Sequence, residues 1–364
     1  MILWLDDQGS ISYEKFLKDV NSVHFKSNSP YAFFVNLVRK LLKENRVQSI
    51  TELTEYLVTC NESFDILTSG TTSSRKRIVV NFQICIRHVK IDSKGVSKVW
   101  GMGYTSSTFA STQVFFQALM NKEKIVYLPS FTFGQLSSVI NEQSVTNLSC
   151  TPTFLGMLMM NMKMQCSSLR QVTTGGEKLT EPISRAMQQV FPNVKYRNIY
   201  ATSETGSLLA SETDIFEIPP RLKNYIKIVN SEIWVHRHLL NQIDLIEKGL
   251  WYNTNDKVEL IDDRRFKIIS RSNGYINTGG YRVSPQRVEA AFYQLDGIID
   301  VHIYGKKNSI LGAVICAEVI GKKLPMIQIK KELSNHLDKH EIPVSIIYVD
   351  SFTRLNNGKK VLMI

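Results

Sequence analysis

The sequence predicts an α/β fold, with a large N-terminal α/β domain and a small C-terminal α+β domain. Within the first half, helical patterns at residues 31–42 and 112–120 alternate with short apolar runs at 125–128 and 148–150. After about Ser270 the pattern changes to a Gly-rich turn region with two helices and short strands, typical of a compact α+β unit. The length of 364 residues also exceeds that of one ordinary domain.

Further elements of the first domain follow from the spacing of apolar residues. Residues 171–174 predict a buried strand, and the pair Gly175-Gly176 ends it in a loop. Residues 181–190 then have helical spacing. Open α/β sheets bind ligands where their strands end in polar, Gly-rich loops, so this loop is a candidate binding site.

The C-terminal unit is expected to be shorter and simpler. Its predicted elements are a Gly-rich hairpin region (274–282), a helix (285–295), two strands (301–304 and 312–319), a helix (326–340) and a strand (346–350). These changes of pattern predict domains at residues 1–269 and 274–364, joined by a hinge at 270–273.

The composition excludes several classes of protein. With 43% hydrophobic and 21% charged residues, the chain is expected to fold. The net charge of +11 suits polyanions such as nucleotides or coenzymes, but no clustered basic–aromatic motif indicates a nucleic acid. The five cysteines form no Cys-x-x-Cys pair, and no signal peptide or membrane-spanning stretch is present. We therefore expect a cytoplasmic protein with no membrane partner.

The segment from Leu67 to Arg77 has the chemistry of a phosphate-binding loop. Its hydroxyls and backbone N–H groups suit phosphate oxygens, and its basic end adds positive charge. It is not a Walker A loop, because Arg75 precedes Lys76 where that motif has Gly. Taken alone, the segment also fits a solvated hairpin turn.

A series of segments, in order, resembles the motifs of the adenylate-forming superfamily, which includes acyl-CoA synthetases, aryl-CoA ligases and amino-acid adenylation domains. Thr68 to Thr72 with Lys76 resemble its phosphate loop, and Gly175 to Glu177 its G-G-E loop. The later matches are to its N-x-Y-G-x-T-E, W-Y-x-T-G-D, hinge and terminal N-G-K motifs, at residues 198–204, 251–256, 271–289 and 357–359. The chain is identified as a short member, with an N-terminal domain reduced before residue 64.

The resemblance implies stacked sheets in the large domain, a mobile small domain, and the activation of a carboxylic acid with ATP and Mg²⁺. An anion must approach a polyanion, so positioning and charge neutralisation should supply most of the catalysis. Lys359 is implied to stabilise charge on the α-phosphate, Ser203 to contact that phosphate, and Glu204 to hold magnesium. The structural alternatives are a solvated tail lysine and a helix N-cap box around Thr202.

The same resemblance implies how the nucleotide is held. Tyr200 stacks on adenine beside Asn198, and the G-G-E loop follows the edge of the base. Asp256 accepts hydrogen bonds from the ribose hydroxyls, to which Arg271 also donates. The implied nucleotide-binding residues are Thr68, Ser69, Gly70, Thr71, Thr72, Lys76, Gly175, Gly176, Glu177, Asn198, Tyr200, Asp256 and Arg271.

Some positions depart from the family motifs. Arg75 and Arg77 replace Pro and Gly in the phosphate loop, and Asn255 replaces a Gly. Asparagine tolerates a positive φ angle better than most residues, so Asn255 is expected to be a mild change. Asn273 replaces the Asp of the hinge, which can alter how the small domain rotates between half-reactions.

The substrates are less well specified. Residues 103–110 contain neither the His nor the Asp that relatives carry there, which disfavours an α-amino acid and weakly favours an aryl, hydroxy or short aliphatic acid. The chain ends soon after Lys359, so the acyl acceptor is expected to be a separate thiol, that of CoA or of phosphopantetheine on a free-standing carrier protein. The alternative is a catalytically weak relative that acts as a nucleotide- or carrier-binding interaction module. The acid, the acceptor and the oligomeric state stay open.

Overall fold

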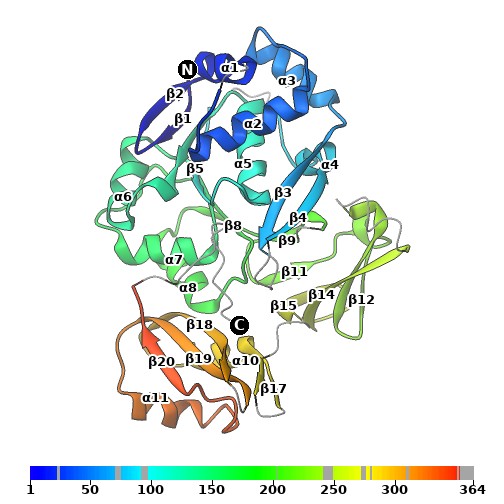
Figure 1. Cartoon of the computed structure of the whole chain (residues 1–364). Coiled ribbons are helices and arrows are strands. Elements are labelled where there is room, and N and C mark those ends of the chain that lie inside the picture. Colours follow the sequence, from blue (N-terminus) through cyan, green and yellow to red (C-terminus); the bar gives the residue numbers. More distant parts are fainter. Residues whose placement is uncertain are drawn as a thin grey trace.

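An eight-stranded sheet forms the centre of the first part of the chain (Figure 1). The computed structural model describes residues 1–22, 25–69, 75–91, 97–202, 204–240, 249–271, 276–278, 281–308, 311–350 and 352. The strand order is β10-β9-β8-β7-β5-β6-β1-β2, and only the edge pairs β9–β10 and β1–β2 are antiparallel. The strands are β1 (Ile2–Asp6), β2 (Gly9–Ser12), β5 (Val99–Gly103), β6 (Lys124–Tyr127), β7 (Asn147–Cys150), β8 (Gln171–Gly175), β9 (Lys195–Thr202) and β10 (Gly206–Ser211).

Helices cover both faces of this sheet. Alternation along β6 sends Ile125 and Tyr127 into one apolar core and Val126 into the other. The first core is shared with α1 (Tyr13–Asn21), α2 (Pro30–Leu42), α3 (Ile50–Thr59), α4 (Phe82–Ile86) and α5 (Phe109–Met120). The second is shared with α6 (Phe133–Glu142), α7 (Pro152–Asn161) and α8 (Glu181–Val190). The predicted α/β class is therefore confirmed, as are the helices expected at 31–42 and 181–190.

Hydroxyl side chains fix where many of these helices begin. Ser12, Ser29 and Ser49 each accept a hydrogen bond from the backbone N–H three residues later, at the starts of α1, α2 and α3. Thr108 and Thr151 do the same for α5 and α7. Each bond satisfies a helix N–H that has no partner within the helix, typically stabilising the helix by about 1 kcal/mol.

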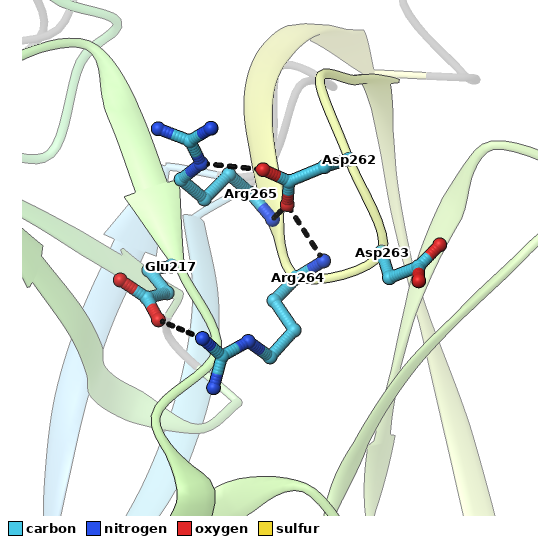
Figure 2. A pocket seen from close by; sticks show the side chains of 5 residues that line it. All are labelled: Glu217, Asp262, Asp263, Arg264 and Arg265. Carbon is cyan, nitrogen blue, oxygen red and sulfur yellow. Dashed lines mark hydrogen bonds and ion pairs between the residues drawn. The ribbon is translucent and has the colours of Figure 1, made fainter.

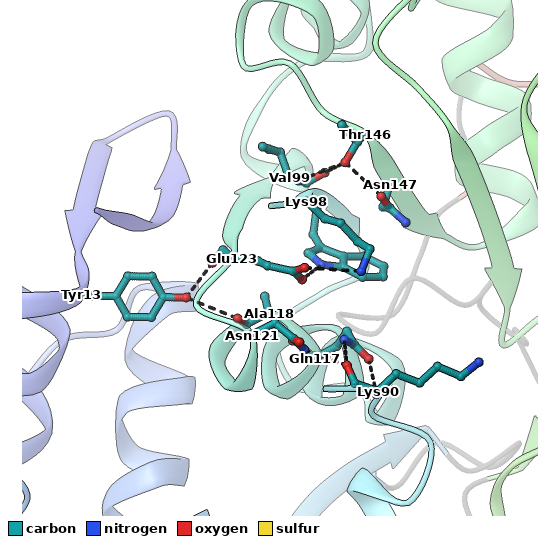
Figure 3. Close-up of polar contacts among 11 residues, drawn as sticks. Tyr13, Lys90, Lys98, Val99, Gln117, Ala118, Asn121, Glu123, Thr146 and Asn147 are labelled. Atoms are coloured by element: carbon teal, nitrogen blue, oxygen red, sulfur yellow. Dashed lines mark hydrogen bonds and ion pairs between the residues drawn. The ribbon is translucent and has the colours of Figure 1, made fainter. Parts of the chain in front are cut away.

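A buried polar network joins α1 to the sheet and to α5 (Figure 3). The Tyr13 hydroxyl donates to the Glu123 carbonyl oxygen at 2.7 Å. The Glu123 carboxylate accepts from Trp100 Nε1 at 2.6 Å, and burial raises the pKa of this carboxyl group. On the other side of α5, the Gln117 amide bonds both the N–H and the carbonyl oxygen of Lys90. These bonds fix the segment after α4 against α5.

Close packing makes Gly103, at the end of β5, sensitive to substitution. Gly103→Ala is expected to lower the free energy of unfolding by about 1–3 kcal/mol, as for other overpacked sites. The new Cβ would lie 2.6 Å from Cys150 Cβ and 2.9 Å from Phe154 Cδ1. Urea unfolding measures the effect. Gly134→Ala is the control, because its nearest neighbour would be Lys163 Cε at 3.8 Å. Equal unfolding midpoints for both variants would contradict the packing argument.

A second sheet of five strands follows the first, and it contains the W-Y-x-T-G-D-like segment and Arg271. Its order is β11-β15-β14-β13-β12, all antiparallel. The strands are β11 (Ile215–Glu217), β12 (Ile226–Val229), β13 (Glu232–His236), β14 (Trp251–Leu260) and β15 (Arg265–Arg271). Asn255 in β14 has a φ angle of 59°, so the expectation that Asn replaces a positive-φ Gly is consistent with the structure.

The segment expected to bind phosphate lies between the paired strands β3 (Ser63–Ser69) and β4 (Arg75–Asn81). The two strands expected around this segment are confirmed, but the loop predicted from Leu67 to Arg77 was too long, because Thr68 pairs with Lys76 and Ser69 with Arg75 within the strands. Short 3₁₀ turns are η1 (Leu128–Ser130), η2 (Pro220–Leu222) and η3 (Arg237–Leu239).

The C-terminal part forms a third sheet with a core of its own, drawn below the rest in Figure 1. Its elements are β16 (Ile276–Thr278), β17 (Tyr281–Val283), α10 (Pro285–Phe292), β18 (Ile298–Asn308), β19 (Gly312–Gly321), α11 (Met326–Leu333) and β20 (Ser345–Tyr348). The prediction of a helix to residue 340 was wrong, because α11 ends at Leu333. There the Ser334 hydroxyl donates to the Lys330 carbonyl oxygen at 2.7 Å, and successive turns replace the helix.

A small apolar cluster joins this third sheet to α7. It consists of Met157, Ile320 and Phe352, which are all buried. The limits of the two domains and of the hinge stay predictions. Across the described segments, no helix has both the length and the apolar character needed to cross a membrane.

Candidate active site

A cleft of about 1170 Å³ lies where the three sheets come together. The parallel strands β7, β8 and β9 end at the same edge of the first sheet, and the residues that follow or end them, such as Thr151, Gly176 and Thr202, line it. The second sheet contributes Asp256, and α10 contributes Glu289. The cleft therefore lies where open α/β sheets bind their ligands.

Six residues predicted to bind the nucleotide line this cleft. They are Gly175, Gly176, Glu177, Asn198, Tyr200 and Asp256. Gly176 has a φ angle of 84°, and a Cβ there would have no heavy atom within 4 Å. Glycine at this position therefore gives the loop its turn, and it leaves the backbone open to a ligand.

Tyr200 and Asp256 join the first sheet to the second. The Tyr200 hydroxyl donates to Asp256 Oδ2 at 2.6 Å, and the two residues are only 6% and 4% exposed. The Tyr200 ring packs against Phe216, with 6.0 Å between ring centroids. Asn198 lies on the same face of β9 and donates to the Thr213 carbonyl oxygen at 3.0 Å. The predicted adenine and ribose positions are thus in direct contact.

The backbone register supports the pairing of Asp256 with Arg271. These residues lie opposite each other in the antiparallel pair β14–β15. Cβ atoms of directly opposed residues are about 4.5–5.5 Å apart. Two positions predicted from separate motifs to bind one ribose are therefore neighbours.

Glu177 offers an acceptor that no described residue uses. Its Oε2 accepts hydrogen bonds from the Thr153 backbone N–H at 3.2 Å and from the Thr153 hydroxyl at 2.6 Å. Its Oε1 is buried, and within the described part of the chain it has no hydrogen-bond partner. A carboxylate oxygen left in this way fits a ligand that donates, such as the exocyclic amine of a base.

Glu204 lies in the turn between β9 and β10 and is half-buried. The predicted alternative of a helix N-cap is wrong, because an antiparallel strand follows this turn. In the described ranges no three His, Cys, Asp or Glu side chains gather as a metal cluster. Mg²⁺ in nucleotide sites is bound through one or two carboxylates and the phosphates, so a single carboxylate still fits this ion.

Several predicted site residues lie outside the described residues. They are Gly70, Thr71, Thr72, Ser203, Asn273 and Lys359. For Thr68, Ser69 and Lys76, the structure gives the place in β3 and β4 and no more. Their roles stay predictions.

Sequence reasoning missed the basic residues of the cleft wall. Arg87, His88, Arg197 and Arg221 all line it. Two of them follow α4, while the others belong to β9 and η2. No sequence motif links such distant positions, and only the fold brings them together.

A second, shallow pocket lies on the turn between β14 and β15 (Figure 2). Four of its five lining residues form ion pairs: Glu217 with Arg264 at 3.2 Å, and Asp262 with Arg265 at 2.6 Å. The Asp262 carboxylate accepts hydrogen bonds from the backbone N–H of Arg264 and from the side chain and backbone of Arg265. These bonds lower the pKa of Asp262 to about 2. These groups already satisfy each other, so the pocket is not a candidate site.

Comparison with known proteins agrees with this geometry. Residues 62–232 match the family of AMP-binding enzymes. A 2-succinylbenzoate–CoA ligase of Lactococcus lactis subsp. lactis is 22% identical over 309 residues, which cover 80% of this chain and 68% of that protein. Bacitracin synthase 3 of Bacillus licheniformis is 23% identical over 336 residues, which cover 82% of this chain but 5% of that protein. The chain thus spans only a small part of some relatives.

Solved structures show the same fold. The o-succinylbenzoate CoA synthetase of Bacillus subtilis, in complex with its acyl-adenylate intermediate, matches with a TM-score of 0.64 and 15% identity, covering 99% of this chain and 94% of that one. ATP-bound MatB of Rhodopseudomonas palustris matches with a TM-score of 0.67 and 14% identity at the same coverage. The chain therefore has the two-domain fold of these enzymes, and its residues 62–232 match the family of AMP-binding enzymes.

Proposed function

We propose that the chain activates a carboxylic acid with ATP. The carboxylate oxygen attacks the α-phosphorus, the bond to the β-phosphate oxygen breaks, and pyrophosphate leaves. A thiol then attacks the carbonyl carbon of the acyl-adenylate, forming a thioester and releasing AMP and a proton. The observation that supports this best is the convergence of the G-G-E loop, Asn198, Tyr200 and Asp256 on one cleft.

The described residues supply binding and orientation of the nucleotide. The Asp256 carboxylate accepts a hydrogen bond from the Tyr200 hydroxyl, and it is proposed to accept hydrogen bonds from the ribose hydroxyls as well. The buried Oε1 of Glu177, which has no partner among the described residues, is proposed to accept a hydrogen bond from the base. When Mg²⁺ is bound, it neutralises phosphate charge, and Glu204 is the residue proposed to hold it.

Lys359 is proposed to reach this cleft from the chain end. Phe352 packs on Met157 of α7, and Thr153, one helical turn earlier in α7, lines the cleft. One turn spans about 6 Å. Lys359 is the seventh residue after Phe352, and a chain of seven residues extends at most about 25 Å. The position of Phe352 therefore supports a role for Lys359 at the α-phosphate.

The thiol acceptor is proposed to be CoA or a carrier-bound phosphopantetheine. The named relatives include both CoA ligases and subunits of peptide synthases, such as surfactin synthase subunit 2 of Bacillus subtilis. The C-terminal residues 274–364 are proposed to form a lid that turns at the hinge, residues 270–273, between the two half-reactions. The apolar contact between the lid and α7, formed by Met157, Ile320 and Phe352, is small. It supports such a turn, because opening the lid would expose little buried apolar surface to water.

Carboxylate-dependent exchange of pyrophosphate into ATP tests the proposal. Purified protein is assayed without thiol against aryl, fatty, hydroxy and amino acids. We expect exchange that depends on one class of acid and on Mg²⁺. Absence of exchange with every acid, with ATP binding still measurable, would contradict the proposal and favour a nucleotide-binding interaction module.

A further inference from the structure

One wall of the cleft gathers positive charge. The side chains are those of Arg87, His88, Arg197 and Arg221, which we call the basic wall. None of the ion pairs in the described part of the chain includes any of the three arginines. Guanidinium groups that line a cleft without a carboxylate partner favour an anionic ligand.

Arg87 is held in place by the backbone that follows β9. Its Nη2 donates to the carbonyl oxygens of Thr205 at 2.6 Å and Ser207 at 2.9 Å, and its Nε donates to His88 Nε2 at 3.2 Å. A guanidinium has five N–H donors, so the two on Nη1 are left for a ligand. Burial lowers the pKa of Arg87, which shows that its charge is partly removed from water.

The charges of the basic wall act on one another. The largest cause that lowers the pKa of His88 is its burial, and the next is the positive charge of Arg87. The charges of Arg221 and Arg197 lower this pKa further. No carboxylate contributes to the shift of His88. The imidazole is therefore neutral near pH 7, and the three guanidinium groups provide the positive charge.

Arg197, the residue of the basic wall that lies in β9, is on the face of that strand opposite to the nucleotide positions. Successive residues of a strand point to opposite faces, so Arg197 points away from the face of Asn198 and Tyr200. In the parallel pair β8–β9, Arg197 lies opposite Thr173, which also lines the cleft. Phe109 and Val114 add an apolar part to the same cleft. The arrangement suits a ligand with a carbon body and an anionic end.

We infer that the acid activated by this chain carries a second anionic group, and that the basic wall binds it while the first carboxylate reacts with ATP. The inference rests on the proposed function, because it concerns the acid of the same reaction. The substrate class is thus a dicarboxylic acid or a carboxylic acid with another distal anion. The binding of a second carboxylate offsets the repulsion among the three arginines.

Paired substrates test this inference. Pyrophosphate exchange is measured, without thiol, for linear dicarboxylic acids of four to ten carbons and for aromatic dicarboxylic acids, each beside its monomethyl ester. We expect kcat/KM to be at least about 10-fold higher for one diacid than for its ester, because the ester cannot accept the charge-assisted hydrogen bonds that a carboxylate accepts from a guanidinium group. Arg197→Gln should reduce this preference to near unity by lowering the kcat/KM of the diacid more than that of the ester, and Arg197→Lys should restore part of it.

Arg170→Gln is the matched control, because Arg170 is exposed, does not line the cleft, and donates to the carbonyl oxygens of Ser167 and Leu169. It should keep the wild-type preference. Arg221→Gln is a second variant of the basic wall, and thermal unfolding shows that each variant is folded.

Equal use of diacid and ester by an active enzyme would overturn the inference and leave the proposed function standing. An Arg197→Gln variant that raises only the KM of CoA in thioester formation would also overturn it, because the wall would then bind the phosphates of CoA. No exchange with any acid would contradict the proposed function itself.

Discussion

Asp256→Asn is expected to lower kcat/KM for ATP about 100-fold in carboxylate-dependent pyrophosphate exchange. The carboxylate is 4% exposed and is bonded by the Tyr200 hydroxyl at 2.6 Å. Hydrogen bonds to a charged group contribute about 1.5–3 kcal/mol, and about 1.4 kcal/mol corresponds to a factor of ten. Asparagine keeps the shape of the side chain, but it loses the charge and turns an N–H₂ group toward hydroxyls that donate.

Asp262→Asn provides the control for this result. Asp262 belongs to the same β14–β15 pair of strands, but it lies at the exposed turn and bonds Arg264 and Arg265. Its replacement should leave exchange unchanged. If both variants exchanged pyrophosphate at the wild-type rate, Asp256 would have no part in nucleotide binding, and the proposed site would be wrong.

Lys359→Ala is expected to lower the rate of adenylation about 100- to 1,000-fold. This range is typical for the loss of one group that stabilises charge in the transition state. Because the lysine is proposed to act on the reacting α-phosphate, the affinity for ATP in the absence of acid should change little. Single-turnover formation of the acyl-adenylate and equilibrium binding of ATP separate the two effects.

The adjacent Lys360 supplies a matched control for that experiment. Lys360→Ala removes the same charge one residue later, so it tests whether position or net charge matters. We expect nearly full adenylation activity. Equal losses in both variants would indicate a general effect of charge in this tail and would contradict a specific role of Lys359.

Local patterns in the sequence predicted those elements whose cause is local. The helix at 181–190 follows from apolar spacing, and it begins and ends as expected. The tolerance of Asn255 for a positive φ angle was also predicted from the residue type, and its φ is 59°. In contrast, the end of α11 depends on a side-chain bond from Ser334, which apolar spacing does not record.

The site was predictable only where family motifs record it. The resemblance pointed to Tyr200 and Asp256, but the bond between them spans 56 residues and two sheets, and no local rule gives it. The basic wall carries no motif at all. Arg87 and Arg197 line one cleft because the backbone after β9, at Thr205 and Ser207, lies beside the segment after α4, which no local pattern records.

The strand order also constrains how the chain can fold during synthesis. β1 contains Trp4, whose parallel neighbour in the sheet is Ile125 of β6. A ribosome adding about 5–20 residues per second needs roughly 6–24 s to make the intervening chain. Until then β1 and its hairpin partner β2 have no sheet to join, although the aromatic side chain of Trp4 must finally be fully buried. The nascent β1–β2 hairpin therefore exposes an apolar strand edge for many seconds, a period in which chaperone binding would protect it from aggregation.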